Sequence, residues 1–155
     1  MSYNHENLIV GCGNILFGDD GFGPEVIKYM KDNEIEIPGD TCLVDGATSA
    51  PHYIFSLPED EWKNIIIIDI ASMDKKPGTV DVLELNQVKE QDRYMDVHGI
   101  SATMPLHDLE EKINIKIVAC QPNVPTEMEI GLTETLTQSI PKTVEATLNV
   151  LNDML

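Results

Sequence analysis

The sequence has few basic residues. Lysine and arginine number 10 against 27 aspartates and glutamates, which gives a formal net charge of -17 over 155 residues. Nucleic acids and anionic membrane surfaces repel a chain of this charge, so we expect neither as a partner. A basic or metal-bearing partner fits better. For most of these carboxylates we expect no role beyond solubility.

Paired cysteines and long apolar segments are also missing. The three cysteines, Cys12, Cys42 and Cys120, are widely spaced and form no Cys-x-x-Cys pair, which predicts reduced, mostly buried thiols in a cytoplasmic protein. The first residues are polar, so no signal peptide is predicted. Apolar runs such as Ile65 to Ile68 are far too short to span a bilayer.

Several well-known motifs are absent too. There is no His-Glu-x-x-His segment, no Gly-x-Ser-x-Gly elbow and no phosphate-binding loop ending in Gly-Lys-Ser/Thr. A dinucleotide fingerprint fails because Leu16 stands where its third glycine is required. We therefore expect neither a self-contained zincin nor a serine hydrolase.

The most informative stretch present is the glycine-rich segment from Gly11 to Pro24. It predicts a strand, a tight turn and a helix, because residues 8–10 are apolar and Pro24 suits a first helical position. Asp19 and Asp20 lie in this turn, at the carboxyl end of the strand, where open α/β sheets bind their ligands. We expect Asp19 to cap the helix and Asp20 to face a ligand, and a carboxylate suits a cation better than an anion.

Buried runs alternate with helical patterns, which predicts a single domain over residues 1–155. Its fold class is α/β, a three-layer α/β/α sandwich with a mostly parallel sheet. Parallel strands are predicted at 7–10, 41–44, 64–69 and 113–119, and an antiparallel strand at 79–85. Helices are predicted at 23–31 and 96–112, together with a C-terminal helix that has Ser139 as its cap. A turn is predicted at Asp45-Gly46, and an irregular or partly helical segment at 47–61.

A second acid marks the same edge of the sheet. Asp69 directly follows four isoleucines, and a carboxylate there is costly unless it is paired, hydrogen-bonded or bound to metal. Ordinary alternatives exist: a turn cap for Asp69, a helix N-cap for Asp20 and a surface position for His98. Together, two carboxylates at the ends of neighbouring strands and one imidazole from a later loop would suit nickel or zinc and leave open coordination positions.

These motifs resemble the hydrogenase maturation endopeptidases, which remove a C-terminal extension from the large-subunit precursor of nickel–iron hydrogenases. The sequence of the glycine-rich segment is most similar to that of the members that serve deazaflavin-coenzyme-reducing hydrogenases of methanogens. The matching residues, in chain order, are Gly11-x-Gly13-Asn14, Asp19-Asp20-Gly21-x-Gly23, Asp45-Gly46-x-Thr48, Asp69, His98 and Ile130-Gly131-Leu132-Thr133.

The resemblance implies a five-stranded twisted sheet and a site made by Asp20, Asp69 and His98. These three would be both the catalytic residues and the ligands of nickel that the precursor carries, so no tightly bound cofactor is expected in the free enzyme. It also implies a cytoplasmic monomer, often classed as an aspartic-type endopeptidase, whose partner is the precursor. Two alternatives stay open: another metal-dependent hydrolase, and a non-catalytic metal- or nucleotide-binding module on the same fold.

Overall fold

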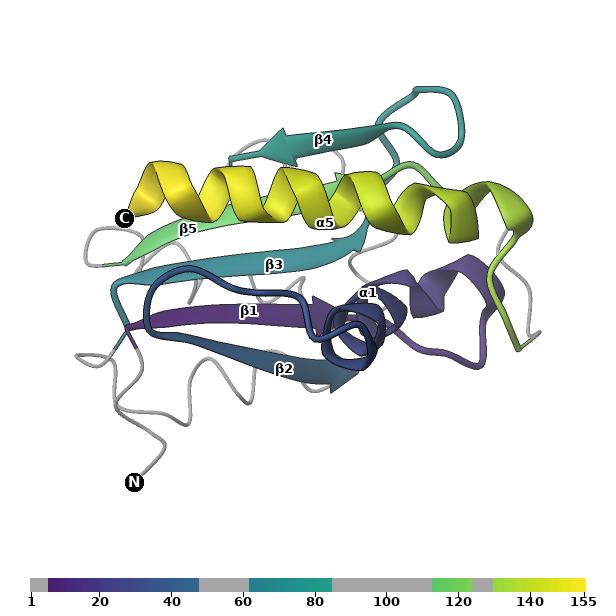
Figure 1. Ribbon diagram of the computed structural model, residues 1–155. Coiled ribbons are helices and arrows are strands. Elements are labelled where there is room, and N and C mark those ends of the chain that lie inside the picture. The colour runs from purple at the N-terminus through teal and green to yellow at the C-terminus, as the bar shows by residue number, and fades with distance from the viewer. Residues whose placement is uncertain (1–5, 48–61, 85–112, 124–129) are drawn as a thin grey trace.

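The structure is a computed structural model that describes residues 6–47, 62–84, 113–123 and 130–155. The described residues form one sheet, a short 3-10 turn and two α-helices (Figure 1). Their bounds are β1 Asn7–Cys12, η1 Gly18–Gly21, α1 Phe22–Asp32, β2 Thr41–Ala47, β3 Asn64–Ile70, β4 Val80–Leu83, β5 Asn114–Cys120 and α5 Glu134–Met154.

The five strands lie in the order β2-β1-β3-β5-β4. The pairs β1–β2, β1–β3 and β3–β5 are parallel, and β4 pairs with β5 antiparallel at the edge of the sheet. The predicted strands and their directions are therefore confirmed. The turn predicted at Asp45-Gly46 is wrong, because β2 continues through it to Ala47 and a register shift in the β1–β2 pairing lies opposite.

The isoleucine run of β3 shows why the centre of the sheet is parallel. Alternate side chains of a strand point to opposite faces, and here both faces are buried. Ile65 and Ile67 belong to one apolar cluster, while Ile66 and Ile68 belong to the other. All four are at most 1% exposed, so the run needs no polar side.

Both α-helices cover the same face of the sheet (Figure 1). The apolar stripe of each helix packs against alternate residues of the central strands, and the two helices also contact each other. The buried apolar residues that the helices contribute are Phe22, Val26, Ile27 and Met30 from α1 and Leu136, Ile140, Val144 and Leu151 from α5.

The second face of the sheet is buried as well. Leu8, Val10 and Ile117 lie in its cluster and are at most 1% exposed. Such burial is expected for a sheet with layers on both faces. The helix predicted at 96–112, and all of the segment predicted at 47–61 except Ala47, lie outside the described residues.

The C-terminal helix starts earlier than predicted. α5 begins at Glu134, and its N-cap is Thr133, whose side chain accepts a hydrogen bond from Leu136 N at 3.4 Å. Ser139 is not a cap. It is buried inside the helix, and its hydroxyl lies 2.8 Å from the carbonyl oxygen of Thr135 and 3.2 Å from that of Gly78. A serine in mid-helix bonds back to an earlier carbonyl, which sequence alone does not distinguish from capping.

Neither described helix is long and apolar enough to cross a membrane.

Candidate active site

The glycines of the turn bring the start of α1 directly onto the sheet. A Cβ at Gly23 would lie 2.3 Å from the carbonyl oxygen of Cys12 and 2.5 Å from that of Ile68. A Cβ at Gly11 would in turn lie 2.3 Å from the carbonyl oxygen of Gly23. No larger residue fits at either position, so the helix begins in contact with the carboxyl ends of β1 and β3.

Gly13 fixes the position of Asp20. Its φ of +139° is a conformation that favours glycine, and a Cβ there would lie 1.8 Å from the carbonyl oxygen of Asp20. The backbone of η1 is thus folded back against the residue that follows β1, and η1 also contacts β3. Asp20 therefore lies in the corner between β1 and β3, eight residues after β1 ends, rather than at the strand end itself.

The Asp20 side chain is 2% exposed and does not cap α1. Its Oδ2 accepts a hydrogen bond from Asn14 N at 3.2 Å. The N-cap of α1 is Gly21, and no side chain makes a capping hydrogen bond there. The cap alternative for Asp20 is therefore wrong, and a buried carboxylate remains to be explained by another role.

Asp69 is fully buried and lies in β3 itself, one residue before the strand ends at Ile70. Its Oδ1 accepts a hydrogen bond from Ile70 N at 2.7 Å, so the backbone holds the carboxylate at this edge. The structure thus places a second buried carboxylate in the corner that holds Asp20.

A buried thiol, that of Cys12, lies close to Asp69. Burial, and after it the nearby charges of Asp69 and Asp45, raise the pKa of the Cys12 thiol well above its usual range. Cys12 is therefore a neutral thiol at physiological pH rather than a thiolate ligand. All three cysteines are free as predicted; Cys12 and Cys120 are buried, whereas Cys42 is half-buried.

Asp19 does something other than predicted. It is 3% exposed, and its carboxylate accepts three hydrogen bonds: from Thr133 N at 2.7 Å, Thr133 Oγ1 at 3.1 Å and Asn123 N at 3.0 Å. None of these donors belongs to α1, so the prediction that Asp19 caps that helix is wrong. Asp19 instead attaches the segment before α5 to the glycine-rich turn.

The third predicted site residue, His98, lies outside the described residues, as do the other three histidines. Within the part of the chain that the structure describes, no group of three or more histidine, cysteine and acidic side chains is arranged to hold a metal ion. The structure therefore brings Asp20 and Asp69 to one corner, and the place of His98 stays a prediction.

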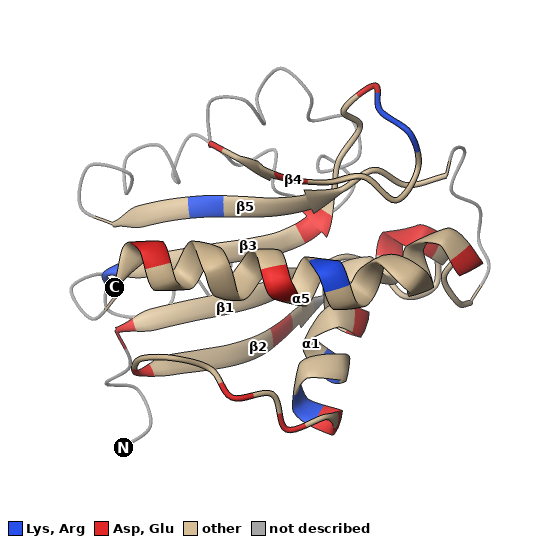
Figure 2. Ribbon diagram, turned by 45° about the horizontal axis from the view of Figure 1, so that its top comes forward, with Lys and Arg blue, Asp and Glu red and all other residues tan. Residues whose placement is uncertain are grey.

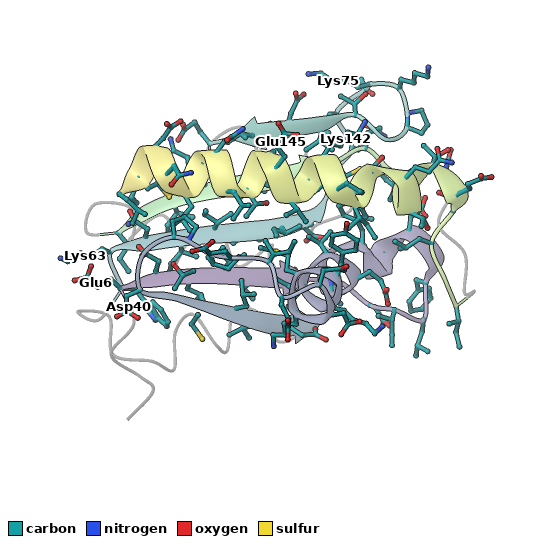
Figure 3. All side chains as sticks on the ribbon, viewed as in Figure 1. Glu6, Asp40, Lys63, Lys75, Lys142 and Glu145 are labelled. Atoms are coloured by element: carbon teal, nitrogen blue, oxygen red, sulfur yellow. The ribbon has the colours of Figure 1, made fainter. Side chains whose placement is uncertain are left out.

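A depression of about 430 Å³ lies elsewhere, between α1 and α5. Tyr29 and Val144 line it, and Glu145 of α5, labelled in Figure 3, is the one carboxylate in its lining. The lining of this depression contains no pair of buried acids like the one at the carboxyl edge of the sheet. The chemistry therefore favours the corner of Asp20 and Asp69 as the site.

Comparison with known proteins identifies the family of the chain. The family model described as hydrogenase maturation protease matches residues 24–150. The chain belongs to this family. It is 39% identical to coenzyme F420 hydrogenase subunit delta of Methanothermobacter thermautotrophicus, over 96% of each chain. It is 23% identical to hydrogenase 3 maturation protease of Escherichia coli, over 90% of this chain and 84% of that one.

Solved structures of hydrogenase maturation proteases share the fold. The maturating endopeptidase HybD of Escherichia coli superposes with a TM-score of 0.73 at 20% identity, covering 96% of this chain and 93% of that chain. The hydrogenase 3 maturation protease gives a TM-score of 0.71 at 19% identity, covering 96% and 91%. The expected α/β fold and the resemblance drawn from the motifs are confirmed, and family membership makes the chain a peptidase.

Sequence reasoning missed two residues of this hydrogenase maturation protease that organise the site. Asn14 gives its N–H to Asp20, and its Oδ1 accepts a hydrogen bond from Leu16 N at 2.9 Å. Thr133 both caps α5 and donates to Asp19. Each stands inside a motif that carried the family resemblance, so the signal was present in the sequence. The fold was needed to show which hydrogen bonds these two residues make.

Proposed function

We propose that this protein is the endopeptidase that removes the C-terminal extension of a nickel-loaded large-subunit precursor of a nickel–iron hydrogenase. Asp20, Asp69 and His98 are the proposed ligands for the nickel of the substrate and the proposed catalytic residues. The observation that carries the proposal is the pair of buried acids, 2% and 0% exposed, at the carboxyl edge of β1 and β3 in a chain of this family.

The donor set suits the proposed substrate. Carboxylate and imidazole are suitable ligands for a divalent ion such as nickel, and three ligands leave coordination positions for groups of the precursor. A cation brought by the substrate would also offset the cost of holding two negative charges away from water. Recognition then depends on nickel, because a nickel-free precursor offers these acids nothing to bind.

Two roles for the acids follow from this placement. As ligands, Asp20 and Asp69 orient the precursor through its nickel, which as a Lewis acid polarises the scissile carbonyl or activates water. As a general base, either carboxylate takes the proton of the attacking water. The backbone donors Asn14 N and Ile70 N orient the two carboxyl groups for both roles.

The remaining parts of the proposal concern partners and place in the cell. The net charge of -17 fits a protein with neither nucleic acid nor membrane as a partner. We propose that the enzyme works as a cytoplasmic monomer and that the precursor is its partner. Similarity to coenzyme F420 hydrogenase subunit delta favours the precursor of a deazaflavin-reducing hydrogenase as the substrate.

The test is incubation of the purified protein with large-subunit precursors, each prepared with and without nickel, followed by mass measurement of the products. Loss of a C-terminal peptide from the nickel-loaded precursor alone is the expected result. Equal cleavage without nickel would instead indicate another kind of hydrolase. No cleavage, combined with tight nucleotide binding, would indicate a non-catalytic module.

A further inference from the structure

Large apolar side chains are exposed beside the candidate site. Among the described residues, the exposed large apolar side chains are Ile15 at 50%, Leu16 at 49%, Val82 at 43%, Ile130 at 78% and Leu155 at 58%. Three of these, Ile15, Leu16 and Ile130, belong to two segments that meet at the carboxylate of Asp19. We call these three residues the lip.

The first segment is a closed turn fastened to Asp20. Asn14 N donates to Asp20 Oδ2 at 3.2 Å, Leu16 N donates to Asn14 Oδ1 at 2.9 Å, and Phe17 N donates to Asn14 O at 3.1 Å. Ile15 and Leu16 therefore stand on a backbone that is held in place. Their exposure is therefore not the result of an unattached loop. Exposed apolar side chains do not stabilise the isolated folded protein.

The second segment is joined to the first by Asp19. Ile130 lies three residues before Thr133, whose N–H and hydroxyl both donate to the Asp19 carboxylate, at 2.7 Å and 3.1 Å. Asn123 N donates to the same carboxylate at 3.0 Å. One buried acid thus holds the segment of Ile130 against the turn that carries Asp20.

The lip is uncharged in a strongly acidic protein. Residues 11–18 and 130–133 contain no acidic or basic side chain, although the chain as a whole has a net charge of -17. Figure 2 shows charged positions of both signs along α1 and α5. A polypeptide that reaches Asp20 across the lip therefore meets apolar side chains instead of the charged side chains found along the helices.

We propose that Ile15, Leu16 and Ile130 bind an uncharged, aliphatic stretch of the precursor polypeptide next to the bond that is cleaved. This inference rests on the proposed function and adds to it a surface that holds the peptide, apart from the acids that meet its nickel. Burial of apolar side chains supplies the affinity, and the shared attachment to Asp19 sets the lip at a fixed place relative to Asp20.

The test compares lip variants with matched variants elsewhere. Leu16→Ser and Ile130→Ser remove exposed apolar side chains from the lip, and Val82→Ser removes one of similar exposure from β4. We expect each lip variant to raise KM for the nickel-loaded precursor about three- to tenfold with kcat nearly unchanged, as for partial loss of an interface contact. Leu16→Met, which keeps the side chain apolar, should retain the wild-type KM.

Several results would contradict the proposed role of the lip. Lip variants with wild-type KM, or with only kcat reduced, would remove the proposed role while leaving the proposed function intact. The same follows if Val82→Ser raises KM equally, or if sedimentation finds a wild-type dimer that Ile130→Ser dissociates, because a second copy would then cover the surface. A wild-type protein that cleaves no precursor would overturn both the function and the lip.

Discussion

The two ends of the sheet hold buried polar groups of different kinds. Where β1 and β3 begin, neutral amides pair with each other: Asn64 Nδ2 donates to Asn7 Oδ1 at 2.7 Å, and Asn7 Nδ2 donates to Asp40 O at 3.2 Å. The charged groups labelled at this end in Figure 3 include Glu6 and Lys63, which form an exposed ion pair at 3.0 Å. Charge stays at the surface here.

Where the same strands end, the buried groups are carboxylates. Asp19, Asp20 and Asp69 are each at most 3% exposed, and each accepts at least one backbone N–H. Burying a charge costs far more free energy than burying a paired amide. One end of the sheet thus buries paired neutral groups, while the other buries carboxyl groups, whose burial cost the substrate cation of the proposed function would offset.

The largest effect should come from Asp69→Asn. Asparagine has nearly the same shape and its oxygen can still accept from Ile70 N, but the negative charge is gone. We expect cleavage of the nickel-loaded precursor to fall by about 100-fold or more, with little change in the thermal midpoint, since both metal ligation and general-base catalysis need the charge. Wild-type cleavage would mean that the site is assigned wrongly. Unfolding would make Asp69 a structural residue.

Asp20→Asn should behave almost as severely. Its side-chain oxygen can keep the hydrogen bond from Asn14 N, so the turn is preserved while the charge is lost. We expect a loss of cleavage of about 100-fold, measured as product mass against time on the same precursor. A variant that cleaves normally while Asp69→Asn is inactive would show that the two acids do not serve one site.

Asp19→Asn separates attachment from chemistry at the carboxyl end. The amide can accept at one oxygen only, so at least one of the N–H donors from Thr133 and Asn123 loses its acceptor. We expect the free energy of unfolding to fall by about 1–3 kcal/mol and cleavage to fall less than in the other two variants. The measurement is urea unfolding together with cleavage rate. An unchanged stability with abolished cleavage would place Asp19 in the chemistry instead.

Asn64→Ala probes the opposite end of the sheet. It removes the donor to Asn7 Oδ1 and leaves a buried acceptor without that partner, which should lower the free energy of unfolding by about 1–3 kcal/mol. Cleavage by the folded protein should be unchanged, because this end holds none of the proposed ligands. A variant that unfolds normally but cleaves slowly would break the comparison between the two ends.

The smallest effect should come from Lys63→Ala. Its ion pair with Glu6 is exposed, with side chains 68% and 52% accessible, and such pairs contribute little to stability in water. We expect no measurable change in the thermal midpoint or in cleavage, with added salt making no difference between variant and wild type. A clear loss of stability would show that charge at this end matters more than the geometry indicates.

The sequence by itself determined the sheet and the corner of the site. Strand positions follow from local apolar runs such as Ile65 to Ile68, and Gly11 and Gly23 allow the helix to approach the sheet closely. Because parallel strands end at one edge, the sequence predicted that Asp20 and Asp69 lie near each other, although Asp20 comes from η1 rather than from the end of β1. The third proposed ligand, His98, remains a prediction because it lies outside the described residues.

Only the tertiary structure decided how Asp19 and Ser139 are used. Both residue types cap helices well, and sequence favoured that local role. Each has a partner far along the chain: Asp19 accepts from Thr133, 114 residues away, and the Ser139 hydroxyl, besides its contact with Thr135 O in the same helix, lies against Gly78 O, 61 residues away. A hydrogen bond of this kind depends on where the fold brings two distant segments, and no property of the neighbouring residues encodes it.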